Sequence, residues 1–160
     1  VLKTIIGMDY LWNKVRVQGG AYGAFANIVR SGNLMFASYR DPNIKETLKT
    51  YDNAANYLDN FTTTNREMLK YIIGTISELD MPLTPSMAGD AAASYYIRRI
   101  SKADRQQERK EVLSTTVKDI SNFSKLVADV MNMNYLVVLG NNGKIKENKD
   151  VFKNLENVFN

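Results

Sequence analysis

The chain of 160 residues contains neither cysteine nor histidine. Disulfide bonds are therefore excluded, and the side chains that bind zinc most often are missing, so the redox compartment stays open. A Ser-His-Asp or Cys-His nucleophilic site is excluded as well, as is the H-x-x-E-H zinc motif. Any metal or histidine-dependent chemistry in which the chain takes part must use residues that lie outside it.

Long apolar runs are also absent, and none approaches the length that a membrane span requires. The opening stretch V-L-K-T-I-I-G-M-D-Y lacks the basic segment and the small-residue cleavage site of a signal peptide. We therefore expect a cytoplasmic location and no membrane partner. The hydrophobic share of 44% is sufficient for the core of one domain, which we expect to span residues 1–160. The net charge of +4 bears on solubility more than on any partner.

Two adjacent glycines mark the most informative stretch, V-R-V-Q-G-G-A-Y-G-A-F at residues 15–25. Gly19 and Gly20 end a preceding helix, because glycine lowers the cost of a positive φ. A strand over residues 21–29, a turn at 30–32 and a strand over 33–39 then predict a hairpin. The helix before the glycines, over residues 2–15, is predicted from apolar residues at helical spacing: Leu2, Ile5, Ile6, Leu11, Trp12 and Val15.

Arg16 and Tyr22 flank the two glycines. Arg16 is a permanent cation with a planar fork of donors, and Tyr22 is a neutral hydroxyl donor at neutral pH. Two such donors near a sharp turn could bind a carbonyl oxygen or a carboxylate. Packing is the alternative explanation, because a strand tyrosine is usually a packing residue and the helix dipole favours arginine at a helix C-terminus.

Helices dominate the middle of the chain. Asp41 followed by Pro42 is typical of an N-cap and the first helical position, and Thr64 and Thr116 each begin a capping-box pattern. The small residues at 88–93 are expected to allow close packing. Together with the apolar stripes, these signals predict helices over residues 44–61, 68–79, 84–100, 101–113 and 117–131.

The last part of the sequence predicts a return to the sheet. An apolar run at residues 135–139 indicates a buried strand, residues 140–143 indicate a turn, and residues 151–158 a short terminal helix. The order of helix, hairpin, helices and strand predicts an α+β fold. We expect a mainly antiparallel sheet with helices packed on one face.

The stretch at residues 15–25, with S-G-N-L-M-F-A-S-Y-R-D-P-N at residues 31–43, resembles the last domain of the pitrilysin/insulinase zinc metallopeptidases, or inverzincins. It is most similar to the presequence-protease subgroup. The resemblance covers roughly residues 2–139. It continues through I-I-G-T-I-S-E-L-D at 72–80, G-D-A-A-A-S-Y-Y at 89–96 and R-K-E-V-L-S-T-T at 109–116.

This resemblance implies a mitochondrial-processing-peptidase-like domain at the C-terminus of a longer metalloendopeptidase, which encloses unfolded peptides in a chamber. Zinc and the glutamate base would lie in the N-terminal half of the enzyme, so the expected partners are that half and a peptide substrate. Arg16 and Tyr22 match the family's Arg–Tyr pair, which contacts substrate at the distant zinc site. A strand precedes this segment in the family, so the sheet is expected to lack its first strand here. Alone, the segment is expected to be inactive and to bind no zinc.

Two other functions are compatible with the sequence. The chain could be a purely structural domain of such a protein, in which case Tyr22 should be buried. It could also be an independent α+β module that binds RNA through a basic surface, although interspersed acidic residues favour a solvated helix and hence no nucleic-acid partner. The basic residues of that surface are Arg98, Arg99, Lys102, Arg105, Arg109 and Lys110.

Overall fold

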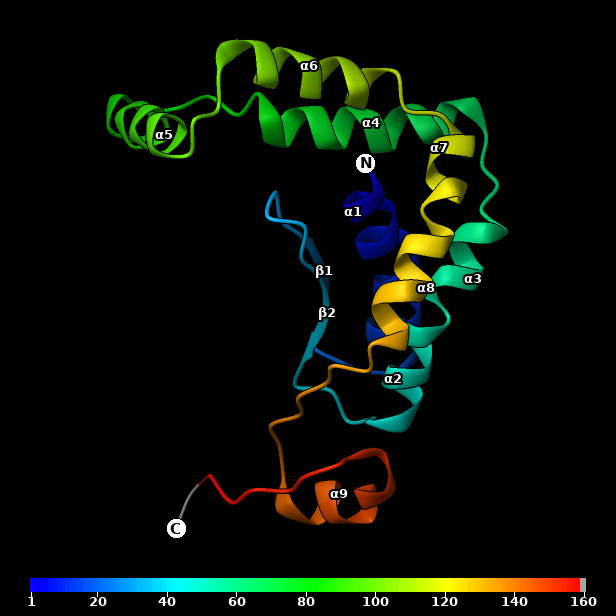
Figure 1. Cartoon of the computed structure of the whole chain (residues 1–160). Coiled ribbons are helices and arrows are strands. Elements are labelled where there is room, and N and C mark those ends of the chain that lie inside the picture. Colours follow the sequence, from blue (N-terminus) through cyan, green and yellow to red (C-terminus); the bar gives the residue numbers. More distant parts are fainter. Residues whose placement is uncertain (159–160) are drawn as a thin grey trace.

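The computed structural model describes residues 1–158. It confirms the α+β class, with one antiparallel hairpin and helices on one of its faces (Figure 1). The elements in chain order are α1 (Leu2–Thr4), the π-helix η1 (Ile5–Gln18), β1 (Gly23–Ile28), β2 (Leu34–Tyr39), α2 (Lys45–Asp52), α3 (Ala54–Asp59), α4 (Asn65–Leu79), α5 (Pro85–Ile97), α6 (Lys102–Leu113), α7 (Val117–Asn122), α8 (Ser124–Asn132), α9 (Asn142–Glu147) and the 3-10 helix η2 (Lys149–Val151). Whether residues 1–160 form one complete domain stays a prediction.

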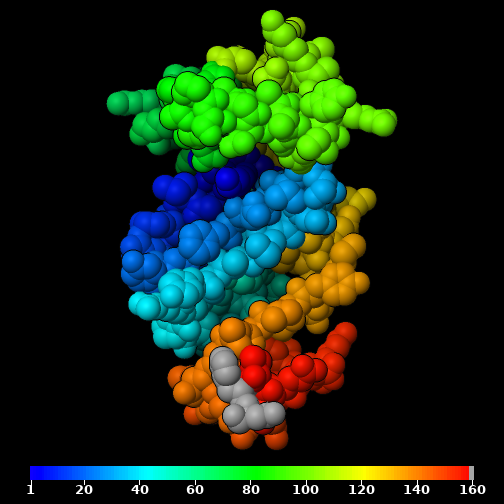
Figure 2. Space-filling view, turned by 90° about the vertical axis from the view of Figure 1, so that its left-hand side faces the viewer, coloured from blue at the N-terminus to red at the C-terminus, as the bar shows by residue number. Residues whose placement is uncertain are grey.

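The hairpin has a buried face and an open face. Strands β1 and β2 pair antiparallel along their whole length, so successive side chains alternate between the faces. Ala24 and Ala26 are buried against η1. Phe25 and Met35 point the other way and are both 55% exposed. Figure 2 looks onto this open side, where the blue and cyan chain crosses the middle of the molecule uncovered.

Helix η1 is wider than the α-helix that the sequence predicts. Its hydrogen bonds span five residues, and its buried side chains follow the same spacing: Ile5, Tyr10 and Val15 form one row, and Ile6 and Leu11 a second. The α-helical period wrongly placed Trp12 in the buried stripe and missed Tyr10. Trp12 is 37% exposed, whereas Tyr10 is 7% exposed. The wider turn thus moves Trp12 to the surface, next to Arg16.

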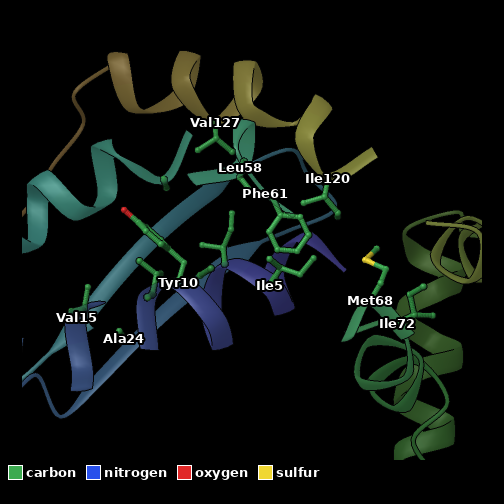
Figure 3. Packing of buried hydrophobic residues seen from close by; sticks show 14 of the residues in the cluster. Ile5, Tyr10, Val15, Ala24, Leu58, Phe61, Met68, Ile72, Ile120 and Val127 are labelled. Carbon is green, nitrogen blue, oxygen red and sulfur yellow. The ribbon is translucent and has the colours of Figure 1, made fainter. Parts of the chain in front are cut away.

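The core lies on both sides of η1. The hairpin covers one side, and α3 covers the other with α8 packed against it (Figure 3). Leu58 of α3, Ile120 of α7 and Val127 of α8 are fully buried in this cluster. Met68 and Ile72 extend it to α4, which lies beside α6. Burying η1 between these layers fixes the direction in which its C-terminal end, with Arg16, meets the hairpin.

Two long predicted helices are each broken in the structure. The helix predicted over residues 44–61 is divided at Asn53, whose side-chain amide donates to the Lys49 carbonyl at 2.9 Å and so competes with the backbone ladder. The helix predicted over residues 117–131 is divided at Phe123, where the backbone N–H bonds to Ile120, only three residues back. Each break lets the two shorter helices turn separately toward the core.

The capping signals are confirmed at Thr116 and only half confirmed at Thr64. The Thr116 side chain accepts from the Asp119 N–H, and the Asp119 carboxylate accepts from the Thr116 N–H at 2.8 Å, which completes the box. The Thr64 hydroxyl accepts from the Glu67 N–H at 3.2 Å, but the Glu67 carboxylate turns to Lys70 instead. A nearby cation thus displaces the reciprocal bond.

The predicted packing of the small-residue helix is wrong. Thr84 caps α5 with Pro85 in its first turn, as expected, but the helix ends at Ile97 rather than at residue 100. No residue of α5 is buried, and the helix extends away from α4 and α6 (Figure 1). Its alanines provide too little apolar area to hold it against the described core.

The C-terminal predictions are also wrong. Residues 135–139 form no strand, and Tyr135 and Val137 are 91% and 95% exposed, because no free strand lies beside them in residues 1–158 to pair with. In place of the turn predicted at 140–143, Asn141 caps helix α9. The helix predicted over 151–158 is absent: η2 ends at Val151, and no regular structure follows up to residue 158.

Two tyrosines of the helical layer differ in how their hydroxyl groups are satisfied. The Tyr57 hydroxyl donates to Asp9 Oδ2 at 2.5 Å, and its ring stacks on Tyr10 at 4.6 Å. Burial, and then the bond to Asp9, raises the pKa of Tyr57 far above its ordinary value. The Tyr51 hydroxyl is buried with no hydrogen-bond partner among the described residues, and burial raises its pKa more than the neighbouring Ser38 side chain lowers it.

We expect Tyr57→Phe to lower the free energy of unfolding by about 1–2 kcal/mol, because it removes a satisfied hydrogen bond to a carboxylate. Tyr51→Phe should change it little or raise it, because that hydroxyl is unsatisfied. Urea unfolding near neutral pH measures both. Equal losses in the two variants would contradict this assignment.

The variant Tyr57→Phe also tests a pH dependence. Because the pKa of Tyr57 is raised on folding, the unfolded chain ionises this group first, and stability falls as the pH rises above about 10. Tyr57→Phe should therefore lose less stability than the wild type between about pH 9 and about pH 11. A wild type and variant with the same alkaline slope would contradict the proposed linkage.

Candidate functional site

The helix η1 ends at two glycines that are needed for different reasons. Gly20 has a φ of +80°, in the left-handed region that favours glycine. Gly19 has an ordinary negative φ, contrary to the expectation for both glycines, but a Cβ there would lie 2.5 Å from the Val15 carbonyl oxygen. The chain therefore reverses tightly here, and the Ala21 N–H donates to the Val15 carbonyl at 3.1 Å.

Residues after β2 hold this glycine turn from the other side. The Asn43 side-chain amide donates to the Gly19 carbonyl at 2.5 Å. Asp41 does not cap a helix at Pro42, as the sequence suggested, because α2 begins only at Lys45. Its carboxylate instead accepts from the Asn43 N–H at 2.9 Å and from the buried Thr47 hydroxyl at 2.7 Å. The segment thus links the end of the hairpin to the end of η1.

Tyr22 lies just before β1 and is held mainly by its backbone. Its N–H donates to the carbonyls of Tyr39 at 3.1 Å and Arg40 at 3.4 Å. The Tyr22 ring meets the Tyr39 ring edge-on, with the centroids 6.0 Å apart. Tyr22 is 67% exposed, and its hydroxyl makes no hydrogen bond with another described residue. This exposure is unlike the buried tyrosine expected of a purely structural domain.

Arg16 lies in the last turn of η1, on the side that carries Trp12. Its guanidinium lies over the Trp12 ring, 3.8 Å from the centroid. Such stacking orients a guanidinium while its N–H edges remain able to donate. No carboxylate within residues 1–158 forms an ion pair with Arg16. No hydrogen bond joins Arg16 to Tyr22 either, so the glycine turn alone connects the two.

The sequence reasoning missed three residues of this site: Trp12, Tyr39 and Arg40. The Arg40 guanidinium lies 5.8 Å from the Tyr22 ring centroid and 5.4 Å from that of Tyr39. The pairing of Tyr39 with Gly23 in the hairpin register could have placed its ring beside Tyr22. The four-residue spacing of Trp12 and Arg16 was the available signal for their stacking.

The arrangement gathers hydrogen-bond donors at one end of the hairpin. Arg16 and Arg40 carry permanent positive charge, and Tyr22 carries a neutral hydroxyl donor. Aromatic rings lie beside each of the two cations and restrict their motion. This chemistry suits an oxygen that bears negative charge, such as a carboxylate or the carbonyl oxygen of a peptide under attack.

Two of the six basic residues near α6 are engaged within the domain. Arg109 pairs with Asp80, and Arg105 lies over the Tyr95 ring at 4.6 Å. Carboxylates alternate with the basic residues along the helix, as the sequence indicated. These contacts favour the solvated-helix interpretation over an RNA-binding surface.

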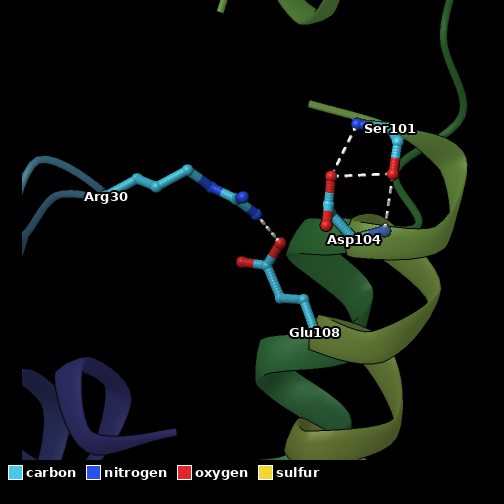
Figure 4. A network of polar contacts seen from close by, with 4 residues as sticks. All are labelled: Arg30, Ser101, Asp104 and Glu108. Atoms are coloured by element: carbon cyan, nitrogen blue, oxygen red, sulfur yellow. Dashed lines mark hydrogen bonds and ion pairs between the residues drawn. The ribbon is translucent and has the colours of Figure 1, made fainter. Parts of the chain in front are cut away.

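A cleft of about 500 Å³ lies between the hairpin tip and α6. Arg30 at the tip pairs with Glu108 across it (Figure 4). Hydrogen bonds from the Ser101 hydroxyl and N–H lower the pKa of the Asp104 carboxyl, and Gln107 donates to Glu111 at 2.9 Å. Each polar side chain that lines the cleft on α6 is therefore already engaged, which is typical of a structural joint.

The described part of the chain offers no obvious place for a metal ion. No group of three or more Asp, Glu, His or Cys side chains within residues 1–158 could hold one. The candidate site is thus one of hydrogen-bond donors alone.

Within residues 1–158, no helix is long and apolar enough to cross a bilayer.

Known proteins resemble the chain over most of its length. The family model described as the PreP C-terminal domain matches residues 1–141. Protein HypA of Clostridium perfringens is 50% identical over 99% of this chain and 16% of that protein. Presequence protease 1, chloroplastic/mitochondrial, of Arabidopsis thaliana is 34% identical over 79% of the chain and 12% of that protein. The chain therefore spans less than a fifth of the length of these relatives.

We expect Gly20→Ala to lower the free energy of unfolding by about 1–2 kcal/mol, because alanine resists the left-handed conformation. Gly7→Ala in η1 is the matched control: a Cβ there meets nothing within 4 Å, so this change should be neutral or stabilising. Urea unfolding of both variants measures the difference. If Gly20→Ala were as stable as Gly7→Ala, the positive φ would not constrain the turn.

Proposed function

The chain belongs to the presequence-protease family as its C-terminal domain, and we propose that it supplies Arg16 and Tyr22 to the active site of a longer peptidase. The observation that carries this proposal is the position of two unpaired donors on either side of the glycine turn, with Tyr22 exposed and Arg16 half-buried. Tyr22 is 67% exposed, and Arg16 stacks on Trp12 without an acidic partner in the described chain. Neither donor is used by a hydrogen bond or an ion pair within the described chain, so both remain able to bind a substrate.

In this role, the Tyr22 hydroxyl donates a hydrogen bond to the carbonyl oxygen of the scissile peptide bond. As negative charge develops on that oxygen, the bond strengthens, so it contributes more to the transition state than to the ground state. The Arg16 guanidinium offers two parallel N–H groups to the substrate backbone or to a carboxylate. Neither residue changes its protonation state, and both act as preorganised donors.

The metal-dependent chemistry is assigned to the rest of the enzyme. The family implies zinc, but this chain has no histidine or cysteine, and its carboxylates form no cluster within residues 1–158. The residues present here therefore do not fit a zinc site. In our proposal, the N-terminal half of the longer protein holds zinc and the glutamate base, and the isolated chain is inactive.

The proposed substrates are unfolded peptides enclosed between the two halves of the enzyme. The chain would form part of the chamber wall; its modest net charge of +4 would suit peptides with some acidic character, but we infer no sequence preference from it. Nucleic acid is not a proposed partner. The cytoplasmic location stays a prediction, and the names of several relatives contain "mitochondrial" or "chloroplastic".

Peptidase activity of the full-length enzyme with Tyr22→Phe tests this proposal. Loss of one transition-state donor should lower kcat about 100-fold while the zinc content stays at the wild-type level. Tyr96→Phe is the matched control, because it removes the hydroxyl of another exposed tyrosine, which lies on α5 outside the site. Its kcat should stay near the wild-type value.

The outcomes separate the alternatives. A large fall only in Tyr22→Phe supports a transition-state contact of that hydroxyl. Near-normal activity would leave the chain a structural domain of the peptidase. Salt-dependent RNA binding by the chain, with normal activity of the variant, would favour the RNA-binding alternative.

A further inference from the structure

Arg40 adopts a backbone conformation that its side chain disfavours. Its φ is +48°, in the left-handed region, where a bulky residue is strained and glycine is not. Of the described residues other than glycine, only Arg99 and Asn134 share this feature. Strained conformations of this kind persist where the surrounding structure holds them, and they cluster at functional sites.

Both ends of Arg40 contact Tyr22. The Arg40 carbonyl accepts from the Tyr22 N–H at 3.4 Å. Its guanidinium lies within cation–π range of the rings of Tyr22 and Tyr39, at 5.8 and 5.4 Å. Since these two rings meet edge-on, the cation lies beside both. Arg40 therefore contacts both parts of Tyr22: its carbonyl binds the Tyr22 backbone, and its guanidinium lies near the Tyr22 ring.

The Arg40 guanidinium is not engaged elsewhere in the described chain. The neighbouring Asp41 carboxylate is occupied by the Asn43 N–H and the Thr47 hydroxyl. No ion pair within residues 1–158 includes Arg40. The two tyrosine rings are thus the contacts that orient this cation.

Tyr22 needs such a neighbour because little else restrains its side chain. At 67% exposure its ring has few packing contacts, and an exposed side chain would sample several rotamers. A donor that stabilises a transition state must already point at its target. A cation on one side and the Tyr39 edge on another would restrict the ring to one orientation.

We infer that Arg40 is a positioning residue, which holds the Tyr22 ring so that its hydroxyl points at the substrate carbonyl. This inference rests on the proposed function, since it assigns Arg40 a part in the same site. The positive φ is then the consequence of directing the guanidinium back over the ring. Arg40 acts through Tyr22 and requires no contact of its own with the reacting atoms.

The first test uses Arg40→Gln, Arg40→Lys and Arg40→Gly in the full-length peptidase. Loss of the cation–π contact should lower kcat about two- to fivefold in the glutamine and glycine variants, with KM little changed. Lysine should restore part of kcat, because it keeps the charge. Glycine also relieves the strained φ, so its loss of activity cannot be ascribed to misfolding of the turn.

Arg99 provides the matched control. It is exposed and has a φ of +54°, but no described contact links it to Tyr22. Arg99→Gln removes the same charge from the same backbone conformation, and its kcat should equal that of the wild type. A loss of kcat equal to that of Arg40→Gln would overturn the inference.

The double variant separates positioning from direct substrate contact. In a Tyr22→Phe background, Arg40→Gln should cause no further fall in kcat, because the hydroxyl that Arg40 positions is gone. An additive fall would mean that Arg40 contacts substrate itself, and full activity of Arg40→Gly would mean that only the backbone turn matters; either result overturns the inference. If Tyr22→Phe is impaired and Arg40→Gln is not, the inference fails alone. If Tyr22→Phe is fully active, both the proposed function and the inference about Arg40 fail.

Discussion

The whole arrangement depends on the burial of helix η1. Its side chains fill the space between the hairpin and helix α3, and the five-residue spacing of Ile5, Tyr10 and Val15 decides which of its faces turns inward. Because that spacing differs from an α-helix, Trp12 and Arg16 emerge together on the surface. The position of the donor pair thus follows from hydrophobic packing, which acts on the opposite side of the same helix.

The glycine turn joins the packed helix η1 to the hairpin and so brings Arg16 and Tyr22 to the same end of the hairpin. A helix and a strand leave it in fixed directions, and Asn43 bonds it to the end of the hairpin. Arg16 therefore projects from the last turn of η1 and Tyr22 from the residue just before β1, while the bonds that hold the turn are made by the backbone and by the Asn43 side chain. Such a division leaves Tyr22 free to contact a ligand without weakening the fold.

The sequence correctly predicted those features of the fold that depend on residues close together in the chain. The hairpin, the helix start at residue 84, the capping box at Thr116 and the flanking positions of Arg16 and Tyr22 all follow from neighbouring residues. The width of η1, the break at Asn53 and the exposure of residues 135–139 depend on which elements pack together, and periodicity does not contain that information. Arg40 was missed for a similar reason, because the whole hairpin separates it from Tyr22 in the sequence although the two residues are neighbours in the structure.

The hairpin leaves the rest of the domain and returns to it at the same place, because hydrogen bonds join its two ends. The bond from Asn43 to Gly19 and the pairing of Tyr22 with Tyr39 close its base, while Arg30 lies at the opposite tip. Added length at the tip would cost little loop-closure entropy and would leave the base unmoved. Insertions and deletions should therefore accumulate in relatives near residues 30–32, whereas the spacing between the glycine turn and Tyr22 should stay constant.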